Sequence, residues 1–141
     1  MFPEKLSQQI IENTTDAILY VNAKGLIQHW NDGAERIFGF SAAEAIGQSL
    51  DIIIPEKLRG RHWEGYYKVM ASGESRYGTD LLSVPANHRN GQRLSVDFSI
   101  VILKDEQGKV TGIASLMRDM TAQRQKEKKL KERIVELEGH N

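Results

Sequence analysis

His62 is the residue whose type and surroundings best suit it to hold a cofactor. It lies in a segment, residues 56–72, whose apolar spacing predicts a helix, with Leu58, Tyr66 and Val69 on the same side. A neutral imidazole that faces an enclosed pocket from the apolar side of a helix is chemically suited to bind iron. The same placement also fits a histidine that only packs and hydrogen-bonds, so both roles stay open.

Other residues that commonly carry chemistry have no comparable setting. His29, His88 and His140 fall on a predicted strand, a turn and a tail, without the spacing of a metal site. The lack of cysteine excludes disulfides, thiolate metal sites and thiol nucleophiles. Paired carboxylates, a phosphate-binding loop and a nucleophile motif are also missing from the sequence. We therefore expect no catalytic residues and no enzymatic activity.

Length and charge point to a single soluble domain. The chain has 141 residues, enough for one core, and its 19 Lys and Arg balance 19 Asp and Glu. A formal net charge of zero favours neither nucleic acid nor an anionic membrane as a partner. No stretch approaches the roughly 20 apolar residues of a membrane span. The expected location is therefore the cytoplasm.

The first half of the chain predicts short elements. Residues 1–13 form an amphipathic helix, and residues 17–21 and 26–30 form a β-hairpin. Two short helices follow, because Asn31 and Asp32 can cap the first, with Glu35 at capping-box spacing from Asp32, and Ser41 with Glu44 repeats that spacing. Glycines end them at 39 and 47. These elements lead into the longer helix that carries His62.

The second half predicts three strands in succession. Residues 76–84, 93–104 and 110–118 are rich in β-forming residues, and the Asn90-Gly91 turn separates the first two. Ser95 and Asp97 alternate with apolar neighbours, so the middle strand has one wet and one buried face. Three strands joined by turns form an antiparallel meander. The element order is thus two strands, short helices, a longer helix and three strands.

The chain ends in a polar helix with a narrow apolar side. From residue 121 the sequence is rich in Gln, Lys, Glu and Arg, and Leu130, Ile134 and Leu137 are spaced four and three apart. This spacing predicts a coiled-coil-like helix that dimerises or connects. The other interpretation is a solvated tail whose apolar residues pack on the domain.

Separated motifs in this layout resemble the PAS family. The matching residues are Asn31, Ala34, Phe38, Gly39, Phe40, Glu44, Gly47, residues 51–55, Asn90-Gly91, and Asp119, Met120 and Thr121. The resemblance covers roughly residues 8–121. It implies an α+β PAS fold, a five-stranded antiparallel sheet with short helices on one face. The expected organisation is a flanking helix at 1–13, a sensory domain at 14–119 and a signalling helix at 120–141.

The resemblance also implies a role in sensing. Asp119 and Thr121 are similar to the junction that joins PAS cores to output helices in sensor kinases and cyclases. A carboxylate and a hydroxyl two residues apart can bond free backbone amides and fix the angle of the next helix. We therefore expect a homodimer formed through the terminal helices, signalling to a histidine kinase, a cyclase or another partner. The alternative is a cofactor-free module for protein interaction and dimerisation.

Residues 55–67 resemble the ligand helix of bacterial haem-based oxygen sensors. The resemblance implies that His62 binds the iron of haem b, that Lys68 lies near a propionate on a solvent-facing edge, and that the protein senses a gas. The expected pocket walls are Tyr66, Val69, Leu82, Val96, Phe98, Ile100, Ile113 and Met117. Leu82 departs from those sensors, which have an arginine at that position. Noncovalent flavin or an empty pocket are the alternatives.

Overall fold

A computed structural model of the chain describes residues 1–75 and 80–139. The elements follow one another in the expected order. They are α1 (Glu4–Asn13), β1 (Ala17–Asn22), β2 (Ile27–Trp30), α2 (Asp32–Phe38), α3 (Ala42–Ala45), the 3₁₀ turn η1 (Leu50–Ile53), α4 (Glu56–Ser72), β3 (Leu82–Asn87), β4 (Arg93–Lys104), β5 (Val110–Asp119) and α5 (Thr121–Glu138). His140 and residues 76–79, part of a predicted strand, lie outside the described residues.

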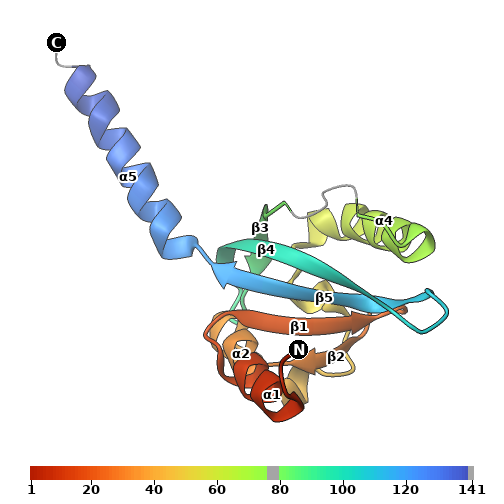
Figure 1. Cartoon of the computed structure of the whole chain (residues 1–141). Helices are drawn as coiled ribbons and strands as arrows, with labels where there is room; N and C mark the ends of the chain where they lie inside the picture. Colours follow the sequence, from red (N-terminus) through yellow and green to blue (C-terminus); the bar gives the residue numbers. More distant parts are fainter. Residues whose placement is uncertain (76–79, 140–141) are drawn as a thin grey trace.

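Five antiparallel strands form a single sheet in the order β2-β1-β5-β4-β3 (Figure 1). The three last strands lie side by side as expected, and β5 also pairs with β1, so the two ends of the domain meet in mid-sheet. Gly91 has a φ of 89° in the β3–β4 turn, a backbone conformation that glycine adopts without strain. The expected α+β fold is confirmed.

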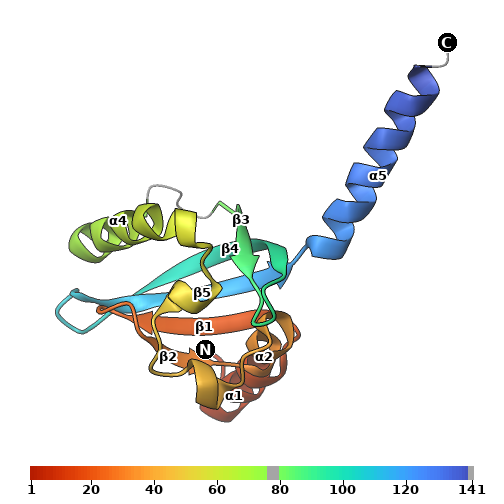
Figure 2. The same cartoon turned by 180° about the vertical axis from the view of Figure 1, so that it is seen from behind.

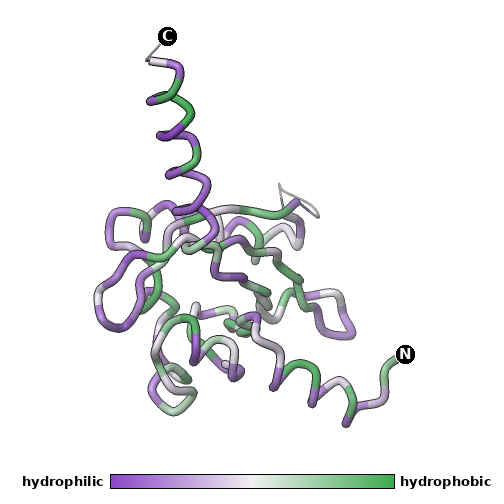
Figure 3. The backbone as a smooth tube through the Cα atoms, turned by 90° about the vertical axis from the view of Figure 1, so that its left-hand side faces the viewer, coloured by the Kyte–Doolittle hydropathy of each residue, from purple (hydrophilic) through white to green (hydrophobic). Residues whose placement is uncertain are grey.

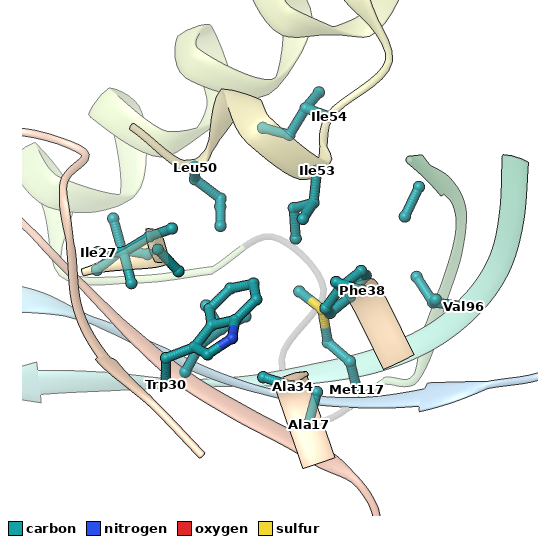
Figure 4. Packing of buried hydrophobic residues seen from close by; sticks show 14 of the residues in the cluster. Ala17, Ile27, Trp30, Ala34, Phe38, Leu50, Ile53, Ile54, Val96 and Met117 are labelled. Carbon is teal, nitrogen blue, oxygen red and sulfur yellow. The ribbon is translucent and has the colours of Figure 1, made fainter. Parts of the chain in front are cut away.

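The core lies between the sheet and the short helices. Leu19, Val96 and Met117 point inward from three strands and are buried. Figure 4 shows η1 directing Leu50 and Ile53 toward Trp30, Phe38 and Met117. Along β1 every second residue is buried, as the period of a strand requires. Seen from the opposite side in Figure 2, α3 and η1 lie in front of this face of the sheet.

The capping of α2 follows one part of the prediction, since Asn31 was one of the two expected caps, and differs in the other. Asn31, not Asp32, is the N-cap, and its side-chain oxygen accepts a hydrogen bond from Ala34 N at 2.9 Å. Glu35 accepts from the backbone of Ala42 instead, at 2.7 Å. Asn31 also bonds to Ile18 N of β1 and to Ile11 O of α1. The second predicted box, Ser41 with Glu44, is confirmed at α3.

The first strand of the meander also differs in its bounds. It was expected over residues 76–84, but β3 begins at Leu82 and continues through Pro85 to Asn87. Proline usually argues against a strand because it offers no N–H to a neighbour. β3 lies at the edge of the sheet, where that loss is tolerated.

α5 extends away from the domain (Figures 1 and 2). None of its residues is buried, and the predicted apolar residues Leu130, Ile134 and Leu137 are exposed. Their packing on the domain, one of the two expectations, is therefore wrong for this structure. Figure 3 shows apolar stretches along both α1 and α5. Among the described residues, no helix combines the length and apolar character that a membrane span needs.

Candidate functional site between α4 and the sheet

Tyr66 fixes α4 to the end of strand β1. Its side chain is buried, and its hydroxyl lies within hydrogen-bonding distance of the carbonyl oxygens of Val21, at 3.1 Å, and of Asn22. Burial, with smaller effects from Tyr20 and Tyr67, raises the pKa of Tyr66 above its ordinary value. The phenol therefore stays protonated and donates. This bond holds the middle of α4 against the sheet.

Trp63 links the same helix to two turns. Its indole N–H donates to Asp51 of η1 at 2.7 Å. Its ring lies so close to Gly25 that any Cβ there would collide with it, and Gly25 has a φ of 81°. Gly25 therefore serves both the turn between β1 and β2 and the approach of the ring. Together Trp63 and Tyr66 fix the face of α4 that carries His62.

His62 presents a neutral imidazole with an unused nitrogen. Its Nδ1 atom is buried and has no hydrogen-bond partner among the described residues. The His62 ring meets the Trp63 ring edge-on, with 4.5 Å between the ring centroids, and its centroid lies 6.0 Å from that of Tyr66. Burial lowers the pKa of His62, and the nearby Asp51 carboxylate offsets only part of that effect. Since an unpaired buried polar atom is costly and uncommon, this nitrogen is chemically available to a ligand.

Most of the predicted pocket residues meet in one place. Tyr66, Val96, Ile113 and Met117 belong to the buried core, and Val69, Phe98 and Ile100 pack against it. Leu82 lies at the margin, half-buried and opposite Phe98 in the β3–β4 pair. Lys68 is not among them. It lies on the exposed side of α4, 3.4 Å from Glu64.

The residues offer a fitting donor for an iron cofactor, but little room for one in this conformation. His62 supplies a nitrogen without a partner among the described residues, beside the rings of Trp63 and Tyr66, which suits haem. The apolar side chains beneath α4 and η1 pack against one another (Figure 4). Two surface hollows of the described residues lie along α5 and on α1, away from His62.

The predicted junction residues anchor the start of α5. The Asp119 carboxylate accepts from the backbone N–H of Thr121 at 2.9 Å, and the Thr121 hydroxyl accepts from Ser95 N at 3.0 Å. Met120 N donates to the carbonyl of Ser95 at 2.8 Å. The expected bonds to free backbone amides are thus present. Their partner, Ser95 of β4, was not predicted, because the register of β4 against the junction is a tertiary feature.

A second contact at the start of α5 was likewise not predicted from the sequence. The Arg124 guanidinium lies 2.9 Å from the Asp97 carboxylate, and the Ser83 hydroxyl donates to the same carboxylate at 2.7 Å. The sequence placed Asp97 on the solvent-exposed face of its strand. It gave no sign that an arginine 27 residues later returns to it.

The comparisons with known proteins agree with this architecture. A family model described as the PAS fold matches residues 5–120. The chain belongs to the PAS family. A solved PAS domain of a protein from Colwellia psychrerythraea superimposes with a TM-score of 0.74, over 84% of this chain and 97% of that one, at 21% identity. At that identity the likeness concerns the fold alone.

Two curated relatives of this PAS domain are named as sensor proteins. Sensor protein FixL of Bradyrhizobium diazoefficiens is 28% identical over 130 residues, which are 92% of this chain and 25% of FixL. Oxygen sensor protein DosP of Escherichia coli is 25% identical over 124 residues, 88% of this chain and 15% of DosP. The PAS domain thus spans a quarter or less of each relative. In neither case does the similarity extend to the rest of the relative.

Proposed function

We propose that this PAS domain is a haem-based gas sensor in which His62 binds the iron and α5 carries the signal onward. The observation that carries the proposal is the buried Nδ1 atom of His62, which has no partner among the described residues. The resemblance of residues 55–67 to the ligand helix of bacterial oxygen sensors supports it, as does the similarity to an oxygen sensor protein.

In this proposal each part of the site has one task. His62 holds the iron, and bound haem supplies a metal that takes up small gases. The inward residues of β4 and β5, with Val69 and Tyr66, wall the pocket and exclude water. Leu82 can donate no hydrogen bond to a bound gas. Bound oxygen is polar and is stabilised by a hydrogen-bond donor. We therefore expect oxygen to bind weakly in comparison with carbon monoxide or nitric oxide.

The experiment is an absorption spectrum of protein produced with haem available. We expect a Soret band in the wild type and its loss or displacement in His62→Ala. His29→Ala is the matched control, because His29 is an exposed histidine on β2. No Soret band in the wild type, or a band that His62→Ala leaves unaltered, would reject this role for His62.

The other candidate function is a cofactor-free module for interaction and dimerisation. The packed core beneath α4 and the exposed apolar residues of α1 and α5 favour it. A colourless protein that dimerises supports this candidate, while a flavin spectrum would point to the noncovalent flavin considered above. In either case we propose a homodimer that signals to a histidine kinase, a cyclase or another partner. The cytoplasmic location stays a prediction.

A further inference from the structure

Four polar side chains form a line across the outer face of the sheet, the face opposite the core. Arg118 of β5 pairs in register with Asp97 of β4, and Asp97 with Ser83 of β3. Asp16 continues the line, because the next residue, Ala17, pairs with Met117. Residues directly opposite one another in antiparallel strands share a face. We call Asp16, Arg118, Asp97 and Ser83 the outer polar row.

Charges along this row are divided into two separate ion pairs. Arg118 turns toward Asp16, with a guanidinium–carboxylate distance of 2.9 Å. Asp97, whose neighbour on β5 is Arg118, forms its ion pair with Arg124 of α5 instead, with 2.9 Å between guanidinium and carboxylate. Only 13% of the Asp97 side chain is exposed, whereas 69% of Arg118 is. The pair with Arg124 is therefore the better shielded of the two.

The position of Arg124 in α5 is electrostatically unfavourable within the helix itself. It is the fourth residue of α5, and a cation in the first turn of a helix is opposed by the helix dipole. The negative charge of Asp97 offsets this unfavourable interaction of Arg124 with the helix dipole. Hydrogen bonds from Arg124 and from Ser83 in turn hold the pKa of the Asp97 carboxyl below its ordinary value. α5 buries none of its residues, so few other contacts fix its direction.

The same strand segments face the candidate pocket on their other side. Leu82 and Phe98 pair with each other and point inward, while their neighbours Ser83 and Asp97 pair and point outward. Successive side chains of a strand lie on opposite faces of one rigid backbone. A displacement of β3 at Leu82 therefore moves Ser83 and, through its 2.7 Å hydrogen bond, Asp97.

We infer that Arg124 is a positioning residue, and that the Ser83–Asp97–Arg124 contact sets the direction of α5 and transmits movements of β3 to it. This inference rests on the proposed relay through α5, but not on the identity of the ligand. It adds a second attachment point to the junction formed by Asp119 and Thr121. With two attachments on β4, the helix direction is defined as well as its origin.

Spin-label distances in the full chain test this inference. Because the chain lacks cysteine, two introduced thiols, Gln28→Cys on β2 and Lys131→Cys on α5, are the sole labelling sites. Residue 131 lies about 15 Å along α5 from its start, so a tilt of about 20° displaces that label by about 5 Å. Dilution with unlabelled protein removes distances between copies. Protein without any added ligand is used.

We expect Arg124→Gln to broaden or shift the distance distribution by about 5 Å, and Arg124→Lys to retain most of the wild-type distribution. Arg118→Gln is the matched control, since it removes the same charge from the other ion pair of the row. Asp97→Asn is the second variant if Arg124→Gln fails to fold by circular dichroism. An unchanged distribution in Arg124→Gln, or the same change in Arg118→Gln, overturns the inference. Neither result depends on the haem spectrum, so failure of the proposed cofactor would be seen separately.

Discussion

Two adjacent tyrosines in α4 have opposite surroundings. Tyr66 is 7% exposed and bonds to the carbonyl groups at the end of β1, whereas Tyr67 is 52% exposed. Neighbours in a helix lie about 100° apart around its axis, so one can face the core while the next faces water. The hydroxyl of Tyr66 is thus structural even though it lies beside the candidate ligand His62.

Removal of that hydroxyl should destabilise the fold measurably. We expect Tyr66→Phe to lower the free energy of unfolding by about 1 kcal/mol, because buried carbonyl groups lose their hydrogen-bond donor. Urea denaturation measures the change. Tyr67→Phe, the same change one residue later, should have no effect within error. Equal effects of the two substitutions would contradict the structural role assigned to Tyr66.

At the scale of elements, Asn31 joins three of them. Its side-chain oxygen accepts from Ala34 N in α2 and from Ile18 N in β1, and its amide donates to Ile11 O of α1 and to Asp16 O. The side chain therefore uses both of its polar atoms inside the protein, with only 3% of the residue exposed. A helix cap here also holds the first helix to the sheet.

Loss of this cap should cost more than loss of an exposed one. We expect Asn31→Ala to lower the free energy of unfolding by about 3 kcal/mol, as the cap is lost and buried amides are left unpaired. Ser41→Ala, which removes the cap of α3, should cost about 1 kcal/mol. Thermal or urea unfolding compares the two. A smaller effect for Asn31 than for Ser41 would show that water replaces the lost bonds.

Local patterns explain which elements the sequence predicted correctly. The spacing of Leu58, Tyr66 and Val69, followed by Gly73, gives α4 with its observed bounds, and β4 likewise matches its prediction. β3 was misplaced, because Pro85 is compatible with a strand only at a sheet edge and edge position is set by the whole fold. The lack of a partner for His62 Nδ1 among the described residues, and the contact of the His62 ring with Trp63, also depend on tertiary packing.

The candidate site divides in the same way. The apolar walls on β4 and β5 followed from alternation along each strand, which is a local property. Lys68 was expected on a solvent-facing edge, and its side chain is exposed on α4, while its place near a propionate stays a prediction. The pairing of Asp97 with Arg124 joins residues of two elements whose relative placement no local pattern encodes.

At the scale of the whole molecule, the two terminal helices leave apolar side chains in water. Leu6, Ile10 and Ile11 of α1 and Leu130, Ile134 and Leu137 of α5 are all exposed. Scattered exposed apolar residues are ordinary, but a spacing of four and three along one helix side is typical of a helix that pairs with another. The proposed homodimer would cover them.

A charge on the apolar side of α5 should therefore weaken the dimer. We expect Ile134→Glu to raise the dissociation constant of the dimer at least about tenfold, since each dimer loses two isoleucine side chains that the proposed interface would bury. Sedimentation equilibrium measures it. Val135→Glu is the control, because Val135 is as exposed but lies off the apolar side. A wild type that is monomeric, or equal effects at both positions, would contradict dimerisation through this helix.

The open edge of the sheet bears on how copies of the domain can meet. β3 ends the sheet on one side, and Pro85 in its middle has no N–H to offer an approaching chain. Such an edge discourages the strand-by-strand growth that leads to fibrils. Extension of the sheet through β3 of another copy is therefore disfavoured, whereas the exposed apolar side chains of α1 and α5 stay open to a partner.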